Sequence, residues 1–392
     1  LYMRDAIIQR TMAERKDLDW QAWRPAIVFM NGTYKGILNI RERSNEDNVW
    51  ANYDKLEDID MIKIAQENSR MVEELQAGDK QSYNLFKAFY SAHGHTLEEY
   101  AKLMDWEEYI NLMAMNFYFN NQDFPGNNMV LWRPKAEGGR WRWIAKDTDF
   151  GLGLYDSPAN YKTLEWIYNP SYDWGRAWGN TSEATRLFRR LMEDADFQRE
   201  FIDRTAIYMG DFLNERGTRE VWDPMYDKIS YEYPKHRELI NPWWPNYYDE
   251  MGKAQRWLSQ RTANFYQQLA DYYKLGSPVK LTVKGGFSTD THAVALSQFD
   301  YGTVAVKGTD SKERNFSFRM MSTEVTQLQY KAITGKNPSS FKGRDRPAEC
   351  ISWYKAVEFC NLLSETQGLT PVYSIKGSRN VGNWGTWNVK DL

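Results

Sequence analysis

Two short polar motifs stand close together in this chain and constrain its fold more than any other feature. The first, Asp-Phe-Pro-Gly-Asn-Asn, begins at Asp123, and the second, Asp-Thr-Asp-Phe-Gly, begins at Asp147. Residues 107–121 before them carry apolar side chains at helical spacing and predict a mostly buried helix. Residues 128–132 and 140–146 between them predict two short strands joined by a turn-rich break. The chain therefore has to place a helix, a polar loop, a hairpin and a second polar loop in that order.

The same order is found in the C-lobe of protein kinases. An aspartate followed five residues later by an asparagine is typical of their catalytic loop, and Asp-Phe-Gly is typical of their metal-binding loop. Neither motif is specific alone. Asp123 also fits a turn aspartate before a Pro-Gly pair, and Asp147 and Asp149 also fit two solvated loop acids. Two solvated loop acids are the less favourable alternative for Asp147 and Asp149, because neighbouring carboxylates repel one another when no cation lies between them.

The N-terminal part supplies candidates for the nucleotide side of such a site. Residues 25–40 predict a β-hairpin that turns at Asn31-Gly32, and residues 59–64 predict a strand that contains Lys63. A helix-like stretch from Ser69 follows, with Glu73 and Glu74. A strand lysine paired with a helix glutamate holds nucleotide phosphates in kinases, although Lys63 fits a solvated strand lysine equally well. No Gly-x-Gly-x-x-Gly phosphate-binding loop is present. If this hairpin packs over the phosphates of a nucleotide, it does so in an atypical way.

Taken together, residues 1–275 resemble the spore-coat CotH kinase family. The segments that carry the resemblance are Met3-Arg-Asp-Ala, Arg24 to Gly36, Arg41-Glu42, Asn121-x-Asp123-x-x-x-x-Asn128 and Trp143 to Asp149. The resemblance implies an α+β, atypical protein-kinase-like fold of two lobes, with a small β-rich N-lobe and a helical C-lobe. It implies transfer of the γ-phosphoryl group of ATP to Ser or Thr of a partner protein with Mg²⁺, and a secreted or cell-surface location.

The resemblance also assigns roles to individual residues. Asp123 matches the catalytic aspartate. The metal-binding positions are Asn128, Asp147 and Asp149, with Asp147 as the main ligand, and the cofactor-binding candidates are Lys63, Glu73 and Gly32. Asp-Phe-Gly thus lies two residues beyond the main metal position. Ala-Lys stands where Pro-Trp commonly precedes the aspartates. A catalytically weak pseudokinase, or a structural or binding module of a multidomain surface protein, is the alternative.

The last part of the chain differs in character. Residues 276–317 predict a short β-rich segment and a linker. Residues 318–392 resemble the N-terminal part of a formylglycine-generating enzyme (sulfatase-modifying factor) domain. The catalytic cysteines and metal ligands of that family lie further along than Leu392, so we expect no formylglycine-generating activity. Cys350 and Cys360, the two cysteines of the chain, match early structural positions, and their spacing permits a disulfide without indicating one.

Length, charge and composition limit the number of domains and the classes of partner that this chain can have. A chain of 392 residues can bury a sizeable core in two or three domains. A formal net charge of −3 without a basic run gives little support to nucleic-acid or membrane-surface binding. No segment is apolar enough to span a bilayer. The chain begins inside a predicted domain and without Met, so we expect it to be a fragment.

Overall fold

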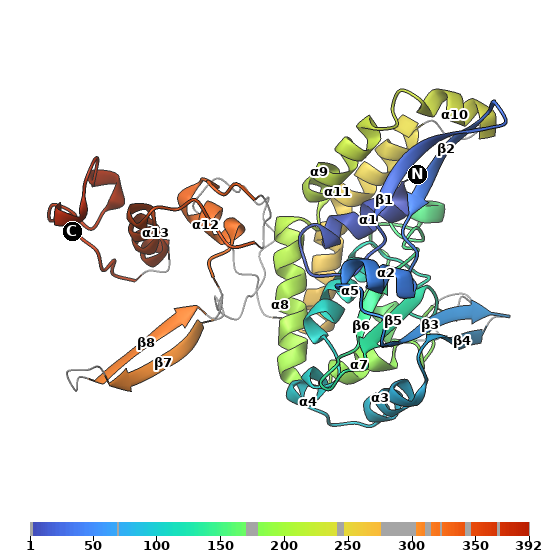
Figure 1. The fold of residues 1–392 in the computed structure, drawn as a ribbon, viewed down its shortest axis with the longest axis horizontal. Coiled ribbons are helices and arrows are strands. Elements are labelled where there is room, and N and C mark those ends of the chain that lie inside the picture. Colours follow the sequence, from blue (N-terminus) through green and yellow to red (C-terminus); the bar gives the residue numbers. More distant parts are fainter. Residues whose placement is uncertain are drawn as a thin grey trace. The chain divides into compact units, whose positions relative to one another are not determined.

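The computed structural model shows a mixed α/β protein with small β-sheets and many helices (Figure 1). It describes residues 3–68, 70–169, 179–240, 247–275, 303–309, 315–321, 324–341, 346–366 and 369–391. The chain divides into two compact units, Leu1–Ser277 and Pro278–Leu392. The polar motifs lie in the first unit.

A four-stranded antiparallel sheet positions both motifs. Its strand order is β4-β3-β5-β6, and the strands are β3 (Ile59–Glu67), β4 (Arg70–Ala77), β5 (Met129–Pro134) and β6 (Arg142–Ala145). The predicted strands at 59–64, 128–132 and 140–146 are thereby confirmed. Lys63 lies opposite Val130, so the strand with the candidate lysine is hydrogen-bonded to the strand that follows the first motif. Candidate nucleotide and catalytic segments therefore share one sheet.

The prediction of a helix after Ser69 is wrong, because this segment forms strand β4. Its glutamates, leucine and alanine favour a helix, but the preceding buried strand offers a complete row of hydrogen-bonding partners. The register pairs Lys63 with Glu74 and Ile64 with Glu73. Side chains of neighbouring strand residues point to opposite faces of a sheet, so the two glutamates are separated. Tertiary pairing has overridden local propensity.

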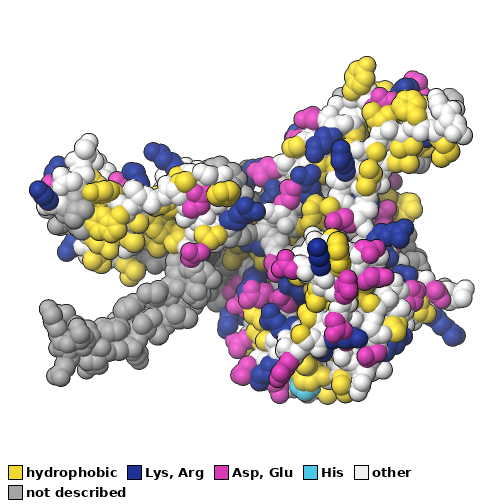
Figure 2. Space-filling view, in the orientation of Figure 1, with side chains coloured by type: hydrophobic (Ala, Val, Ile, Leu, Met, Phe, Trp, Pro, Cys, Tyr) yellow, Lys and Arg dark blue, Asp and Glu magenta, His cyan; other side chains and the backbone are white. Residues whose placement is uncertain are grey.

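The predicted N-terminal hairpin is confirmed. Strands β1 (Trp23–Met30) and β2 (Thr33–Arg41) pair through a turn at Asn31 and Gly32, whose φ values are 50° and 76°. Positive φ at both positions is the geometry that favours an Asn-Gly turn. Helix α10 (Tyr233–Ile240) packs on β2, and hydrophobic side chains gather over this region in Figure 2.

Helices form the body of the first unit. Helix α5 (Trp106–Tyr118) matches the predicted buried helix. The remaining helical elements of this unit are α1 (Arg4–Ala13), α2 (Glu46–Asn52), α3 (Gln81–Ser91), α4 (Leu97–Ala101), η1 (Leu154–Asp156), α6 (Thr163–Tyr168), α7 (Arg186–Leu191), α8 (Ala195–Asp211), α9 (Glu215–Asp227) and α11 (Tyr247–Tyr272).

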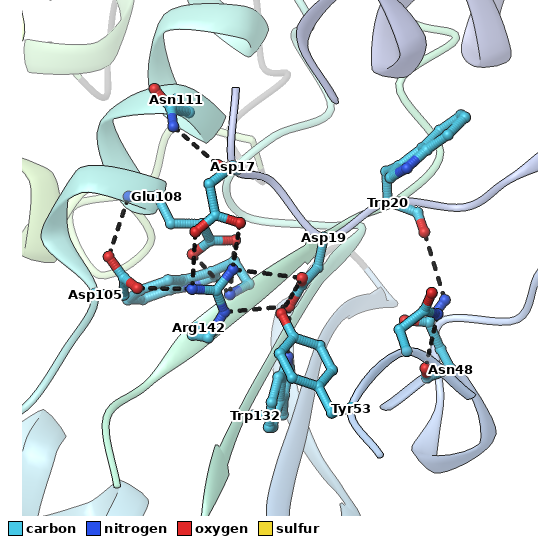
Figure 3. A network of polar contacts seen from close by, with 12 residues as sticks. Asp17, Asp19, Trp20, Asn48, Tyr53, Asp105, Glu108, Asn111, Trp132 and Arg142 are labelled. Carbon is cyan, nitrogen blue, oxygen red and sulfur yellow. Dashed lines mark hydrogen bonds and ion pairs between the residues drawn. The ribbon is translucent and has the colours of Figure 1, made fainter. Parts of the chain in front are cut away.

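A half-buried cluster of acids around Arg142 fastens the segment after α1 to the sheet and to α5 (Figure 3). Arg142 on β6 lies 3.0 Å from Asp17 Oδ1 and 2.6 Å from Asp105 Oδ2. Asp19 also faces this guanidinium, and its carboxylate accepts hydrogen bonds from Trp132 and Tyr53. The carbonyl of Asp19 accepts a hydrogen bond from Ala145 N at 2.7 Å. Because β6 leads directly into Asp147, these contacts fix the start of the second motif.

The second unit is smaller. Strands β7 (Thr303–Thr309) and β8 (Asn315–Met321) pair antiparallel, followed by α12 (Gln327–Thr334), α13 (Trp353–Thr366), η2 (Val381–Asn383) and η3 (Val389–Asp391). Strand β7 lies within residues 276–317, where the sequence predicts a short β-rich segment and a linker, whereas residues 276–302 lie outside the described residues. Cys350 and Cys360 are free thiols.

Candidate active site

The first motif begins directly after α5, where buried polar bonds hold the chain. Arg261 on α11 is fully buried and donates to the carbonyls of Phe117 and Tyr118 at 2.8 and 2.7 Å. These are among the last carbonyls of α5, which have no partner within the helix. The Asn121 side chain accepts from the Asp123 amide at 3.2 Å. The segment that leads from α5 into Asp123 is therefore held by Arg261 and Asn121.

Asp123 and Asn128 are in direct contact. Asn128 Nδ2 donates to Asp123 Oδ2 at 2.6 Å, and Asn127 Nδ2 donates to the same oxygen at 2.8 Å. Asn128 has a φ of 55°, a left-handed conformation that asparagine tolerates better than most residues. The five-residue spacing in the sequence thus corresponds to a closed loop. Because its amide nitrogen points to Asp123, the Asn128 carbonyl oxygen is directed elsewhere.

The second motif presents two solvent-accessible carboxylates on either side of a buried residue. Asp147 and Asp149 are exposed, whereas Thr148 between them is 1% exposed. Asp147 has a φ of 47°, outside the conformations that most residues prefer. The two carboxyl groups lie close enough to interact electrostatically. The loop therefore turns both acids outward while its centre stays anchored.

The two carboxyl groups resist ionisation. Partial burial, followed by repulsion from Asp149 and Asp5, raises the pKa of Asp147 to about 6. Partial burial and the charge of Asp5 likewise raise the pKa of Asp149, and the charge of Asp123 adds to this rise. Asp123 thus lies within electrostatic range of the second motif. Several carboxylates that repel one another favour an added cation at the same place.

Lysines border the carboxylates on the sheet side. Lys63 Nζ lies 2.8 Å from Glu74 Oε2 on the neighbouring strand. Desolvation and the charge of Lys63 lower the pKa of Lys146, while Asp147 and Glu74 act in the opposite direction. Lys146 therefore lies within electrostatic range of both Lys63 and Asp147. The lysine–glutamate pair expected from the sequence exists, but it joins two strands and uses Glu74.

Two other predicted cofactor residues are not brought to this cluster. Glu73 accepts hydrogen bonds from Lys87 at 2.6 Å and Tyr83 at 2.9 Å, on the other face of β4. Gly32 lies in the exposed turn of the hairpin, and a Cβ there meets no atom within 4 Å. The hairpin contacts the site through Arg41 at its other end. Gly32 and Arg41 are separated by nine residues of strand, which corresponds to about 30 Å.

Three residues that carry charge near the second motif received no role in the sequence analysis. Arg41 Nη2 lies 2.6 Å from Asp5 Oδ2, and Asp5 Oδ1 accepts a 2.8 Å hydrogen bond from the Thr148 amide. Arg4 donates to the carbonyls of Gly151 and Leu152 at 3.0 and 3.1 Å. Arg4, Asp5 and Arg41 lie in segments that resemble the CotH family. That resemblance was the one signal in the sequence analysis that could have pointed to them. Local pattern alone does not reveal contacts between residues more than 140 positions apart.

The donor set suits a hard divalent cation. Among the described residues, no three His, Cys, Asp or Glu side chains are grouped so that they hold a metal by themselves. The predicted set contains two carboxylates, Asp147 and Asp149, and the amide of Asn128. Mg²⁺ commonly binds through one or two carboxylates together with water and substrate phosphates. Two carboxylates with raised pKa values and one amide oxygen fit that pattern.

A separate hollow lies on the same unit. It has a volume of about 480 Å³. Its lining includes Tyr168, Arg189, Arg190, Tyr272 and Lys274. None of the predicted site residues lines it. Arg189 donates to Ser182 O and Thr185 Oγ1, and Arg190 pairs with Glu193, so these guanidinium groups are already engaged.

The sequence model of the family described as "CotH kinase protein" matches residues 1–265, about two thirds of the chain. The chain belongs to the CotH kinase family. This confirms the first resemblance. The match ends at residue 265, so the resemblance of residues 318–392 to formylglycine-generating enzymes stays a prediction.

A shorter similarity links the chain to a protein of Paenibacillus barcinonensis described as "Chaperone protein LppX". The two sequences are 50% identical over 52 residues, which is 13% of this chain and 19% of that protein. The aligned part spans about a fifth of that relative's length. In the part of the chain that the structure describes, no helix is both long and apolar enough to cross a membrane.

Proposed function

We propose that this protein transfers the γ-phosphoryl group of ATP to a serine or threonine of a partner protein, with Mg²⁺ as cofactor. The observation that carries the proposal is the convergence of groups from separate parts of the chain. Asp123 is hydrogen-bonded to Asn128 and lies within electrostatic range of Asp149, while Lys146 lies within electrostatic range of both Asp147 and Lys63. This combination of carboxylates, one amide and lysines is the set that phosphoryl transfer uses.

Asp123 is the proposed catalytic residue. Its carboxylate orients the acceptor hydroxyl and takes its proton as the new bond between the hydroxyl oxygen and the γ-phosphorus forms. The bond between that phosphorus and the oxygen that bridges to the β-phosphate breaks, and ADP leaves with the electron pair. Hydrogen bonds from Asn127 and Asn128 hold the carboxylate in one orientation. Less conformational entropy is then lost when the transition state forms.

The neighbouring groups bind the nucleotide. Asn128, Asp147 and Asp149 are the proposed metal-binding residues, and Mg²⁺ bound there supplies neutralisation of the phosphate charge. Lys63 and Lys146 offer positive charge to the phosphates from the sheet side. Glu74 is the proposed partner of Lys63, in place of Glu73. Gly32 is not assigned a role in phosphate binding, because it lies in the hairpin turn distant from these groups.

A direct test is transfer of phosphate from ATP to the protein itself and to dephosphorylated casein, measured by intact mass. We expect phosphorylation in the presence of Mg²⁺ and a loss of about 10²- to 10⁴-fold in rate for Asp123→Asn. Asp79→Asn, a substitution at an exposed loop acid after β4, is the matched control. Equal rates for Asp123→Asn and the unsubstituted protein contradict the proposed role of Asp123.

A pseudokinase that binds partners is the second candidate, and one observation favours it. The hairpin that replaces the usual phosphate-covering loop turns at Gly32, away from the carboxylates. Nucleotide binding without phosphoryl transfer is the expected behaviour in that case. The proposed location is secreted or cell-surface, in keeping with the family. For residues 318–392 we propose a partial domain without formylglycine-generating activity.

A further inference from the structure

We infer that Asp5, at the start of α1, is a positioning residue that holds the Asp147–Asp149 loop in its metal-binding conformation through Thr148. The inference rests on the proposed function, because it assigns to Asp5 an effect on the metal affinity of that same site. Asp5 is 142 residues before Asp147, and neither motif includes it.

The contacts converge on the centre of the loop. Asp5 Oδ1 lies 2.8 Å from the Thr148 amide nitrogen and 3.0 Å from Thr148 Oγ1. The Thr148 hydroxyl also lies 3.1 Å from the Asp5 carbonyl oxygen. A carboxylate that accepts from a backbone amide forms a charge-assisted hydrogen bond, which is stronger than a neutral one. Thr148 is 1% exposed, so water does not readily replace this partner.

A second attachment lies at the far end of the loop. Arg4, 7% exposed, donates from one nitrogen to the carbonyls of Gly151 and Leu152. Gly151 is closely packed, because a Cβ at this position would be 3.0 Å from Ile8 Cδ1 and from Phe119 O. The first two residues of α1 therefore hold the loop at its centre and at its end. Asp147 and Asp149, which flank Thr148, are left pointing to solvent.

Asp5 is itself oriented by its neighbours. Arg41 Nη2 lies 2.6 Å from Oδ2, and Gln9 Nε2 donates to Oδ1 at 2.6 Å. One oxygen therefore faces the hairpin and the other faces the loop. Groups that orient metal ligands without touching the metal commonly change metal affinity by about 10- to 100-fold when they are removed. Asp5 has the position and the bonds of such a group.

A purely structural role makes a different prediction from a positioning role. If Asp5 only stabilises the fold, its loss lowers the melting temperature and leaves the Mg²⁺ concentration needed for nucleotide binding unchanged. If it positions the loop, that Mg²⁺ concentration rises. Asp5 also contributes negative charge at the site, so a variant without a change in charge is needed. Thr148→Val removes a hydroxyl, keeps the size of the side chain and leaves every charge in place.

The experiment measures the Mg²⁺ midpoint of the ATP-induced rise in melting temperature. We expect an increase of about 10- to 100-fold for Asp5→Ala. A smaller increase is expected for Asp5→Asn, whose side-chain oxygen still accepts from the amide. For Thr148→Val we expect about threefold to tenfold, and Thr148→Ser should restore the original midpoint. Glu14→Gln removes an exposed acid after α1 and should not alter the midpoint.

Hydrogen exchange at the Thr148 amide gives a readout that needs no ligand. We expect faster exchange in Asp5→Ala and unchanged exchange in α8. Midpoints within twofold of the original for both Asp5→Ala and Thr148→Val overturn the positioning role. If Asp147→Asn abolishes the Mg²⁺ response in the same assay, the proposed function survives that result. If Asp147→Asn responds like the original protein, the proposed function and the inference both fail.

Discussion

Two acidic clusters lie within a few residues of each other along β6 and the loop after it, and they differ in how their charge is balanced. In the first, Asp17, Asp19 and Asp105 surround Arg142, whose side chain is 14% exposed. In the second, Asp147 and Asp149 are exposed and repel one another, with Asp5 adding to the repulsion. The nearby Arg41 is 2.6 Å from Asp5, so its charge is engaged there.

The difference separates a structural cluster from a candidate binding site. Burial acts to lower the pKa of Arg142, but Glu108, Asp19 and Asp17 outweigh it and raise the pKa, so the charge of Arg142 persists at every accessible pH. The first cluster therefore contains its own cation. The second cluster keeps carboxyl groups with raised pKa values at a solvent-accessible position, an arrangement that a cation from solution stabilises.

The largest effect on stability is expected from removing the cation of the first cluster. Arg142→Ala removes the guanidinium that faces Asp19 and Asp105, whose side chains are 11% and 15% exposed. Breaking a buried ion pair costs about 3–5 kcal/mol. Arg140→Ala is the control, since Arg140 is more exposed and lies 3.7 Å from Asp105. Urea unfolding of both variants measures the difference, and equal losses of stability would contradict the structural role of Arg142.

Substitution of Lys63 should affect ligand binding more than folding. Lys63→Met removes a cross-strand pair that is about one third exposed, which costs roughly 0.2–1 kcal/mol of stability. The loss of a charged hydrogen-bond donor to phosphate should weaken ATP binding by about 1.5–3 kcal/mol. Isothermal titration with ATP and Mg²⁺ measures this change. Lys35→Met, at an exposed site on β2, is the control.

Acidification should weaken metal binding at the second cluster. The pKa of Asp147 is raised to about 6, so below that pH a proton competes with the cation. We expect the Mg²⁺ midpoint to rise by at most about tenfold per pH unit below pH 6, because one proton is displaced. Asp147→Asn should lose this dependence, and a midpoint that is constant from pH 7 to pH 5 would argue against Asp147 as ligand.

The metal-free protein should show the opposite trend. The pKa of Asp147 is higher in the folded chain than its ordinary value of 3.8, so between these values the folded state binds more protons. The stability contributed by this group is therefore greatest at low pH and decreases as the pH rises through about 6. Thermal unfolding of the original protein and of Asp147→Asn, each without divalent cations, isolates the contribution.

The smallest effect is expected at the hairpin turn. Gly32→Ala places a side chain at φ 76°, where an alanine is strained, and should destabilise the protein by about 1 kcal/mol. ATP affinity should remain the same, because the turn lies far from the carboxylates. Lower ATP affinity in this variant would show that the hairpin turn covers the phosphates after all.

Much of the framework was predictable from local pattern. Helix α5 shows the helical spacing of apolar residues, and the Asn31-Gly32 turn has the residues that its positive φ values require. The segment with Glu73 was wrongly predicted as a helix, because its propensity is local whereas its partner is β3. The link from Asp5 to Thr148 joins residues 143 positions apart. No periodicity or spacing rule connects such residues, so the structure was needed to find it.

The central claim is that Asp147 and Asp149 form a cation site for a nucleotide, whereas the acids around Arg142 do not. Isothermal titration of ATP, with and without Mg²⁺, tests this most directly in the original protein, Asp147→Asn and Asp17→Asn. We predict Mg²⁺-dependent ATP binding in the original protein and in Asp17→Asn, with a loss in Asp147→Asn. Equal Mg²⁺-dependent binding by all three proteins would contradict the account.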